Sequence, residues 1–134
     1  MLQFTKETDY GIQLLIALTK LKDGQVLSLR KFSATNSISF LFLQKVVRKL
    51  REAGLVKSNQ GARGGYSLNK PLGKISLKKV LEAIDGESAV SSCLRAGRQY
   101  RCMKEGDCGV KKIFCKINEH LVRYLQSIKL SDCV

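Results

Sequence analysis

Residues 27–68 read LSLRKFSATNSISFLFLQKVVRKLREAGLVKSNQGARGGYSL, and this stretch determines the fold that we expect. Ser28 and Ser39 each stand directly before a run of helical periodicity, where a serine hydroxyl is a favourable N-cap. The pattern predicts a short helix after Ser28 and a longer helix over residues 40–53. Asn36 lies at the turn between them, and because asparagine tolerates a left-handed backbone we expect it to adopt that conformation.

The segment after the second helix has the composition of a β-hairpin. Gly54 is placed to end the helix in a left-handed conformation, and residues 55–58 and 66–69 read as two short strands. The loop between them, NQGARGG, contains three glycines, which allow its backbone to approach another segment closely. A helix-turn-helix followed by such a hairpin is typical of a winged helix-turn-helix, which binds duplex DNA.

Apolar periodicity predicts further helices on both sides of this stretch, and we place them at about 6–20, 77–85 and 109–128. The last of these has a regular seam of apolar residues, which suggests a coiled-coil-like surface for a partner. We therefore expect a mainly α-helical fold with a small β-hairpin wing. Its predicted parts are a winged helix-turn-helix DNA-binding domain over 1–86, a cysteine-containing loop over 87–108, and a dimerisation helix with its tail over 109–134.

The chain carries a formal net charge of +13, which favours phosphate-rich polymers or anionic surfaces as partners. Most basic helix faces are simply solvated. That explanation does not account for the apolar side chains in the first turn of the helix over 40–53, the part of a recognition helix that enters the major groove. We predict DNA contacts from Ser28, Ser39, Phe40, Gln44, Lys45, Arg48, Lys57, Ser58, Gln60, Arg63 and Tyr66.

These residues have different expected roles on DNA. Ser39, Phe40 and Gln44 are placed to contact base edges or thymine methyl groups. Arg63, at the tip of the wing, is suited to a narrow minor groove, and Lys57 to phosphate.

Three of the five cysteines, Cys93, Cys102 and Cys108, have the spacing C-x8-C-x5-C. The first ten residues do not resemble a secretion signal, so we expect a cytoplasmic protein whose cysteines are ligands or redox sensors. Arg and Lys residues stand between and beside these cysteines, and positive charge favours the thiolate, which binds metals and reacts with oxidants. The spacing alone leaves two interpretations open, buried inert thiols and a metal or iron–sulfur site.

Other function classes fit poorly. No apolar run approaches the roughly 20 residues that a membrane span requires. The single histidine and the few acidic residues offer no obvious site for enzyme chemistry, so we expect neither a small-molecule substrate nor catalysis. Tyr66 is the only aromatic residue in the hairpin region, which is too few for an RNA-binding platform.

The motifs TDYGIQLLIAL, ISFLFLQKVVRKLREAGLV, SNQGARGGYSL and ISLKKVLEAIDG resemble the Rrf-type winged-helix regulators, the group that contains IscR, NsrR and CymR. The resemblance covers nearly the whole chain. It implies a homodimer whose long C-terminal helices pair, and whose recognition helices and wings bind a palindromic operator in double-stranded DNA. Gln60 stands where the family often has arginine, with Arg63 nearby, so the preferred DNA sequence is expected to differ from that of better-known members.

The resemblance also implies a cofactor, because many members hold an iron–sulfur cluster on three loop cysteines that match Cys93, Cys102 and Cys108. Whether the cluster is 2Fe–2S or 4Fe–4S stays open. The gap between Cys93 and Cys102 is longer than is typical of the family.

The fourth cluster ligand differs between branches of the family. The position of a histidine ligand in the IscR branch is occupied by Lys111. Asp9 matches an aspartate that, in the NsrR branch, reaches across from the partner subunit, so Asp9 is the expected fourth ligand. Cys115 is the alternative.

The resemblance therefore implies a transcriptional regulator whose DNA binding is controlled by an iron–sulfur cluster that responds to iron–sulfur status, redox state or nitric oxide. We expect it to act as a repressor. The alternative is a cluster-free regulator of the same family that senses by thiol oxidation or through a partner protein, as the CymR branch does.

Overall fold

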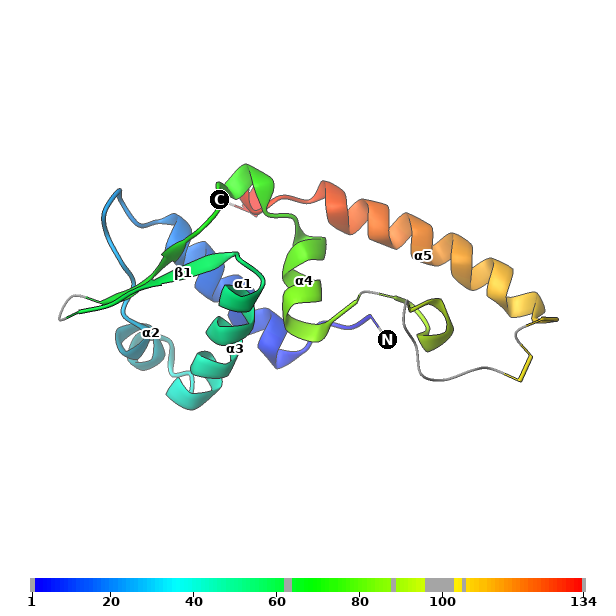
Figure 1. Cartoon of the computed structure of the whole chain (residues 1–134), viewed down its shortest axis with the longest axis horizontal. Coiled ribbons are helices and arrows are strands. Elements are labelled where there is room, and N and C mark those ends of the chain that lie inside the picture. The colour runs from blue at the N-terminus through cyan, green and yellow to red at the C-terminus, as the bar shows by residue number, and fades with distance from the viewer. Residues whose placement is uncertain (1, 62–63, 88, 96–102, 105, 134) are drawn as a thin grey trace.

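The computed structural model describes residues 2–61, 64–87, 89–95, 103–104 and 106–133. It is mainly helical with one small hairpin, as predicted, and Figure 1 shows the arrangement. The helices are α1 (Lys6–Thr19), α2 (Leu29–Asn36), α3 (Phe40–Glu52), α4 (Leu77–Asp85) and α5 (Gly109–Ser127), and the strands are β1 (Val56–Asn59) and β2 (Gly65–Leu68). Among the described residues there are also three short 3-10 turns: η1 (Leu72–Lys74), η2 (Ser92–Leu94) and η3 (Leu130–Cys133).

The helices of the winged domain begin where side-chain caps are available. The hydroxyls of Thr5, Ser28, Ser39 and Ser76 each accept a hydrogen bond from the backbone amide three residues later, at 3.2 to 3.4 Å. Each of these bonds satisfies an amide that has no partner inside the helix. At the other end of α3, Gly54 has φ +75°. The predicted caps at Ser28 and Ser39 and the predicted end of α3 at Gly54 are therefore confirmed.

The turn between α2 and α3 differs from the prediction. Ser37, not Asn36, adopts the left-handed conformation, with φ 54°. Asn36 remains the last residue of α2, where its side-chain amide donates to the carbonyl oxygen of Phe32 at 2.9 Å. Because this bond satisfies a carbonyl at the helix end from within the helix, the chain turns one residue later.

The core lies where α1, α3 and α4 meet, with α2 and the base of the hairpin packed around it. Its fully buried members include Leu14, Leu43, Val46 and Val80. The chain after α5 returns to this core, since Leu130 is 1% exposed and belongs to the same cluster. Backbone bonds hold the return: the Leu77 amide donates to Ile128 at 2.8 Å, and the Leu130 amide to Ile75 at 2.9 Å.

The hairpin is attached to the segment that precedes α2. Leu27 and Tyr66 exchange two backbone hydrogen bonds, each of 2.9 Å, and so form an isolated antiparallel bridge beside β2. The close approach depends on Gly65, where a Cβ atom would lie 2.5 Å from the carbonyl oxygen of Leu27. The wing is therefore fixed relative to the helix-turn-helix by backbone contacts.

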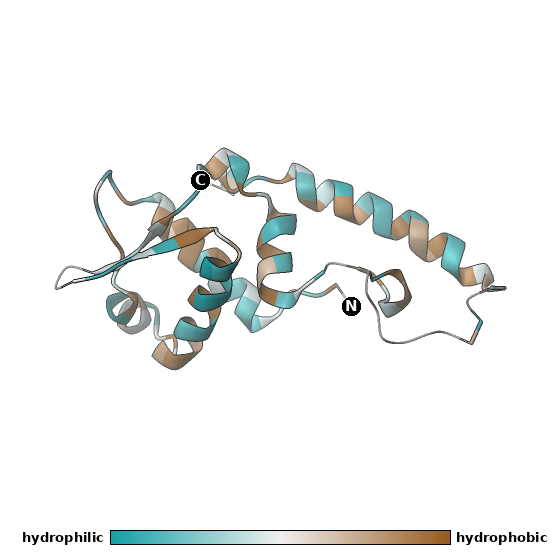
Figure 2. Cartoon of the chain, in the orientation of Figure 1, coloured by the Kyte–Doolittle hydropathy of each residue, from teal (hydrophilic) through white to brown (hydrophobic). Residues whose placement is uncertain are grey.

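Helix α5 forms an arm that leads away from this core (Figure 1). Within α5, only Leu125 is buried. Apolar residues recur along the arm, as the brown bands in Figure 2 show. One face of the helix exposes Val110, Ile113, Phe114, Ile117 and Tyr124. An apolar face of this size does not remain in water without cost.

Candidate nucleic-acid interface and cysteine segment

A groove of about 380 Å³ runs between the helix-turn-helix and the hairpin. Helices α2 and α3 form one side, and both strands with their loop form the other. The groove brings together six of the residues predicted to contact DNA: Ser28, Phe40, Gln44, Ser58, Gln60 and Tyr66. It also contains Arg30 and Arg51, which the sequence analysis did not select.

The groove combines cationic, amide and aromatic groups. The Arg30 guanidinium lies 4.4 Å from the centre of the Phe40 ring and covers one face of it. Gln44 and Gln60 supply amides that can both donate and accept, and Arg51 supplies a second cation. This combination can bind phosphate and read base edges in the same groove.

Four of the remaining predicted contacts lie outside the groove. Lys45 and Arg48 are exposed on α3, and Arg48 pairs with Glu52 at 3.1 Å. Lys57 lines a separate hollow of about 1000 Å³ between the hairpin and the end of α1. It does so because successive side chains of a strand point to opposite faces, so Lys57 and Ser58 diverge. Ser39 caps α3, and Arg63 lies outside the described residues.

Leu41 is a further residue of α3 that the sequence analysis missed. It is the second residue of the helix, and 76% of it is exposed. Its neighbours Phe40 and Phe42 are both partly covered. A local apolar pattern could not distinguish the three, because the covering residues come from other helices.

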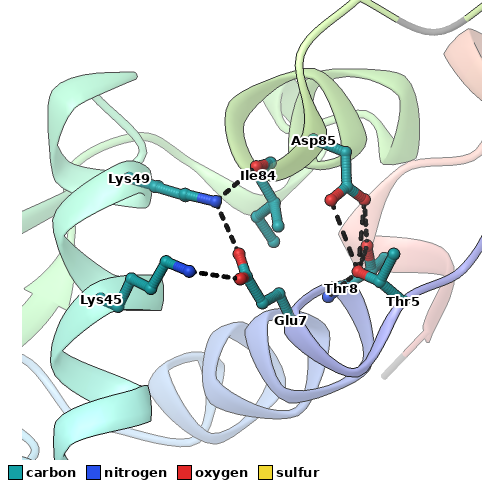
Figure 3. A network of polar contacts seen from close by, with 7 residues as sticks. All are labelled: Thr5, Glu7, Thr8, Lys45, Lys49, Ile84 and Asp85. Atoms are coloured by element: carbon teal, nitrogen blue, oxygen red, sulfur yellow. Dashed lines mark hydrogen bonds and ion pairs between the residues drawn. The ribbon is translucent and has the colours of Figure 1, made fainter.

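A polar network joins the first turn of α1 to α3, as Figure 3 shows. The Glu7 carboxylate lies 3.0 Å from Lys45 Nζ and 2.6 Å from Lys49 Nζ. Lys49 also donates to the carbonyl oxygen of Ile84 in α4, at 3.0 Å. The hydrogen bond from Lys49 and, to a smaller extent, that from Lys45 hold the pKa of Glu7 below its ordinary value of 4.5, although burial acts in the opposite direction.

The same turn of α1 is bound to α4 on its other side. Thr8 is fully buried, and its hydroxyl donates to Asp85 Oδ2 at 2.6 Å. Thr5 donates to the same carboxylate at longer distance (Figure 3). The first turn of α1 is therefore held between α3 and the end of α4, from which the chain continues into the cysteine segment.

The described cysteines lie in different settings. Cys93 is half-buried in η2, with its Sγ 3.3 Å from the hydroxyl oxygen of Ser91. Cys108 is the half-buried residue directly before α5, and Cys115 is half-buried on α5. Cys102 lies outside the described residues. Asp9 is exposed on α1 and accepts a hydrogen bond from the Gln13 side chain at 2.9 Å.

Among the residues that the structure describes, no three His, Cys, Asp or Glu side chains lie close enough together to hold a metal ion. Cys93, Cys108 and Asp9 are thus not brought together within one chain. The donor set itself suits an iron–sulfur cluster, because cysteine thiolates are the usual ligands of such clusters. Within the same part of the chain, no helix combines the length and apolarity that crossing a membrane would need.

Comparison with known proteins relates the chain to transcriptional regulators. A family model described as Rrf2, iron-dependent transcriptional regulator, matches residues 4–134. The transcriptional regulator NsrR of Bacillus subtilis is 28% identical over 124 residues, which span 92% of this chain and 82% of the relative.

Solved structures give the same relationship. The structure of CymR, the global cysteine regulator of B. subtilis, superposes with a TM-score of 0.78 at 26% identity, and the match covers 99% of this chain and 96% of CymR. The structure of T. potens IscR superposes with a TM-score of 0.71 at 24% identity over 98% of this chain and 85% of IscR, which supports the fold alone.

Proposed function

Since the chain belongs to the Rrf2 family of iron-dependent transcriptional regulators, we propose that it is a homodimeric regulator whose binding to a palindromic operator is controlled by an iron–sulfur cluster. That it is a DNA-binding transcriptional regulator and not an enzyme follows from its relatives. We assign DNA binding to residues 1–86, the cluster to 87–108 and dimerisation to 109–134, and we place the protein in the cytoplasm.

The groove between α3 and the wing is the observation that carries the proposal. Gln44, Gln60 and Arg51 line it together, so that base-reading amides stand beside a phosphate-binding cation. Lys45, Arg48 and Lys57 lie outside it, where they can neutralise the phosphates that flank the grooves. The net charge of +13 supports the same partner.

The exposed apolar face of α5 supports the homodimer. Ile113 is 59% exposed in the single chain, and Val110 and Ile117 lie along the same face. Pairing two copies of the arm would remove this face from water and set two recognition helices side by side for the two halves of a palindrome.

We assign the cluster to Cys93, Cys102 and Cys108, with Asp9 of the partner subunit or Cys115 as the fourth ligand. When bound, the cluster supplies a redox-active, oxidant- and nitric oxide-sensitive group on these thiolates. The chain contributes a short connection to the DNA-binding helices. Cys93 follows shortly after α4, and the end of α4 is bonded through Asp85 to the first turn of α1, which also carries Asp9.

The second candidate is a cluster-free regulator that senses by thiol oxidation or through a partner protein. The observation that favours it is the likeness to CymR, which extends over nearly the whole of both chains. In that case Cys93 and Cys108, both half-buried, would be the reactive thiols.

The experiment that decides between them measures iron, acid-labile sulfide and the visible absorption spectrum of protein purified without oxygen. We expect stoichiometric iron and sulfide. Cys93→Ser, Cys102→Ser and Cys108→Ser should each lose them, while Cys133→Ser, in η3, serves as the matched control and should retain them. Asp9→Ala and Cys115→Ala then test the fourth ligand. Protein that stays colourless and iron-free after reconstitution would overturn the cluster assignment and favour thiol sensing.

A further inference from the structure

Helix α3 begins with four consecutive apolar residues, Phe40–Leu43, whose environments differ. Leu43 is fully buried in the core. Phe40 lies under the Arg30 guanidinium. Phe42 packs edge-to-face against Tyr10 of α1, with 5.5 Å between the ring centres. Leu41 is 76% exposed and belongs to no part of the core cluster. One apolar side chain is therefore left facing solvent at the start of the recognition helix.

Leu41 lies on the polar face of α3. Residues three, four and seven positions apart share one side of a helix, so Leu41 is aligned with Gln44, Lys45 and Arg48. All three of these polar residues are exposed. The cationic side chains along this strip complement a polyanion and do not suit an apolar protein partner, whose interface core would exclude them.

We propose that Leu41 is a specificity-determining residue that contacts the C5-methyl group of a thymine in the major groove. The inference rests on the proposed DNA-binding function. A leucine side chain has no donor or acceptor with which to read a base edge, and the thymine methyl is the apolar group that bases present in the major groove. The same role was expected of Phe40, but Arg30 covers one face of that ring, whereas Leu41 is open.

The test removes one methyl group from the DNA and pairs this change with a change in the protein. The probe is a palindromic duplex that this protein selects from a random-sequence library. Each thymine is replaced in turn, symmetrically in both half-sites, by deoxyuridine, which lacks only the methyl group. Binding is measured with the unmodified protein and with Leu41→Ala and Leu41→Met.

We expect one symmetric position at which deoxyuridine weakens binding of the unmodified protein by about fourfold for each half-site, the effect of burying about one methyl group. Leu41→Ala should bind the thymine and deoxyuridine duplexes equally at that position, and Leu41→Met should again prefer thymine. Phe4→Ala, which changes another exposed apolar residue outside the interface, should keep the full preference. Leu41 lies outside the core cluster, so substituting it should not change the midpoint of urea unfolding. Measuring this midpoint for each variant shows separately that the variant is folded.

Two outcomes would overturn the inference, and only one of them would also overturn the proposed function. A selected duplex that is bound specifically, but whose sensitivity to deoxyuridine is absent or is unchanged in Leu41→Ala, refutes the role of Leu41 and leaves the proposed function intact. Failure to select any duplex over random DNA refutes the proposed function, and the role of Leu41 falls with it.

Discussion

Glu7 in α1 and Lys49 in α3 form an ion pair with 2.6 Å between Oε2 and Nζ, and Lys49 also binds the Ile84 carbonyl of α4. Three helices thus meet at one ammonium group. The Glu7 side chain is 18% exposed and that of Lys49 is 31% exposed, so water screens the pair only in part. The pair fixes the orientation of α3 relative to the turn that carries Asp9.

Glu7→Gln should therefore destabilise the fold. The substitution leaves the Lys49 and Lys45 ammonium groups without their carboxylate while keeping the side chain's size. We expect a loss of about 1 to 2 kcal/mol in the free energy of unfolding, between the values for exposed and buried pairs. Urea denaturation measures this loss. A double-mutant cycle with Lys49→Met isolates the interaction energy between Glu7 and Lys49.

The matched control is Glu52→Gln, which breaks the exposed ion pair with Arg48 inside α3. Such pairs contribute about 0.5 kcal/mol or less. If Glu7→Gln cost no more than Glu52→Gln, the network between α1 and α3 would have no special role in stability.

The stabilisation by Glu7 should also depend on pH. Its pKa is lowered by Lys49 and then Lys45, so the folded state binds this proton less readily than the unfolded chain does. The contribution is fully present above the ordinary value of 4.5 and is lost as the pH falls through the lowered pKa. The difference in urea midpoint between the unmodified protein and Glu7→Gln, both free of metal, should shrink below that pH. A difference that stayed constant down to acid unfolding would contradict this.

The features that the sequence predicted correctly depend on neighbours within four residues, although the turn at Asn36 shows that not every local feature was predicted. The hydroxyls of Ser28 and Ser39 cap their helices because a cap needs only the next turn of backbone. The identity of the exposed residue in the first turn of α3 was not predictable in this way. It depends on Arg30 and Tyr10, which reach the turn from other helices.

Two further features were missed for the same reason. The pairing of Glu7 with Lys49 joins residues 42 positions apart, and neither residue differs locally from an ordinary solvated charge. The return of Leu130 to the core is likewise long-range, since its backbone bond is to Ile75. For the cysteines, the family resemblance indicated the candidate ligands, but a ligand from a second chain cannot be derived from one chain's periodicity.

Gly65→Ala should separate the wing from the helix-turn-helix. The added Cβ would lie 2.5 Å from the Leu27 carbonyl oxygen, so the two backbone bonds between Leu27 and Tyr66 cannot both persist. We expect a loss of about 1 to 3 kcal/mol in unfolding free energy and faster hydrogen exchange at the Leu27 amide. Gly73→Ala, which meets nothing within 4 Å, is the control and should change neither. Equal exchange in the two variants would refute the role of Gly65.

Charged and uncharged residues of the groove should differ in their effect on the salt dependence of DNA binding. Arg51→Ala should reduce the slope of log K against log salt by about one unit, if Arg51 neutralises one phosphate. Gln44→Ala should leave that slope unchanged and relax the preference at one base pair by about tenfold, since an amide that reads a base edge carries no charge. Fluorescence anisotropy on the selected duplex and on single-base variants of it measures both. The reverse assignment of the two effects would show that the residues exchange roles.

Ile117→Asp should dissociate the proposed dimer. Ile117 lies at the centre of the exposed apolar face of α5, 44% exposed in the single chain. A carboxylate at this position would be buried against its own copy across the dimer axis, which is strongly unfavourable. Sedimentation equilibrium should show monomers, and affinity for the palindromic duplex should fall towards that for a half-site. Gln126→Asp adds the same charge elsewhere on α5 and should leave the dimer intact, because within the arm the two positions lie on opposite sides of the helix. A dimer that survived Ile117→Asp but not Gln126→Asp would place the interface on the other face of α5.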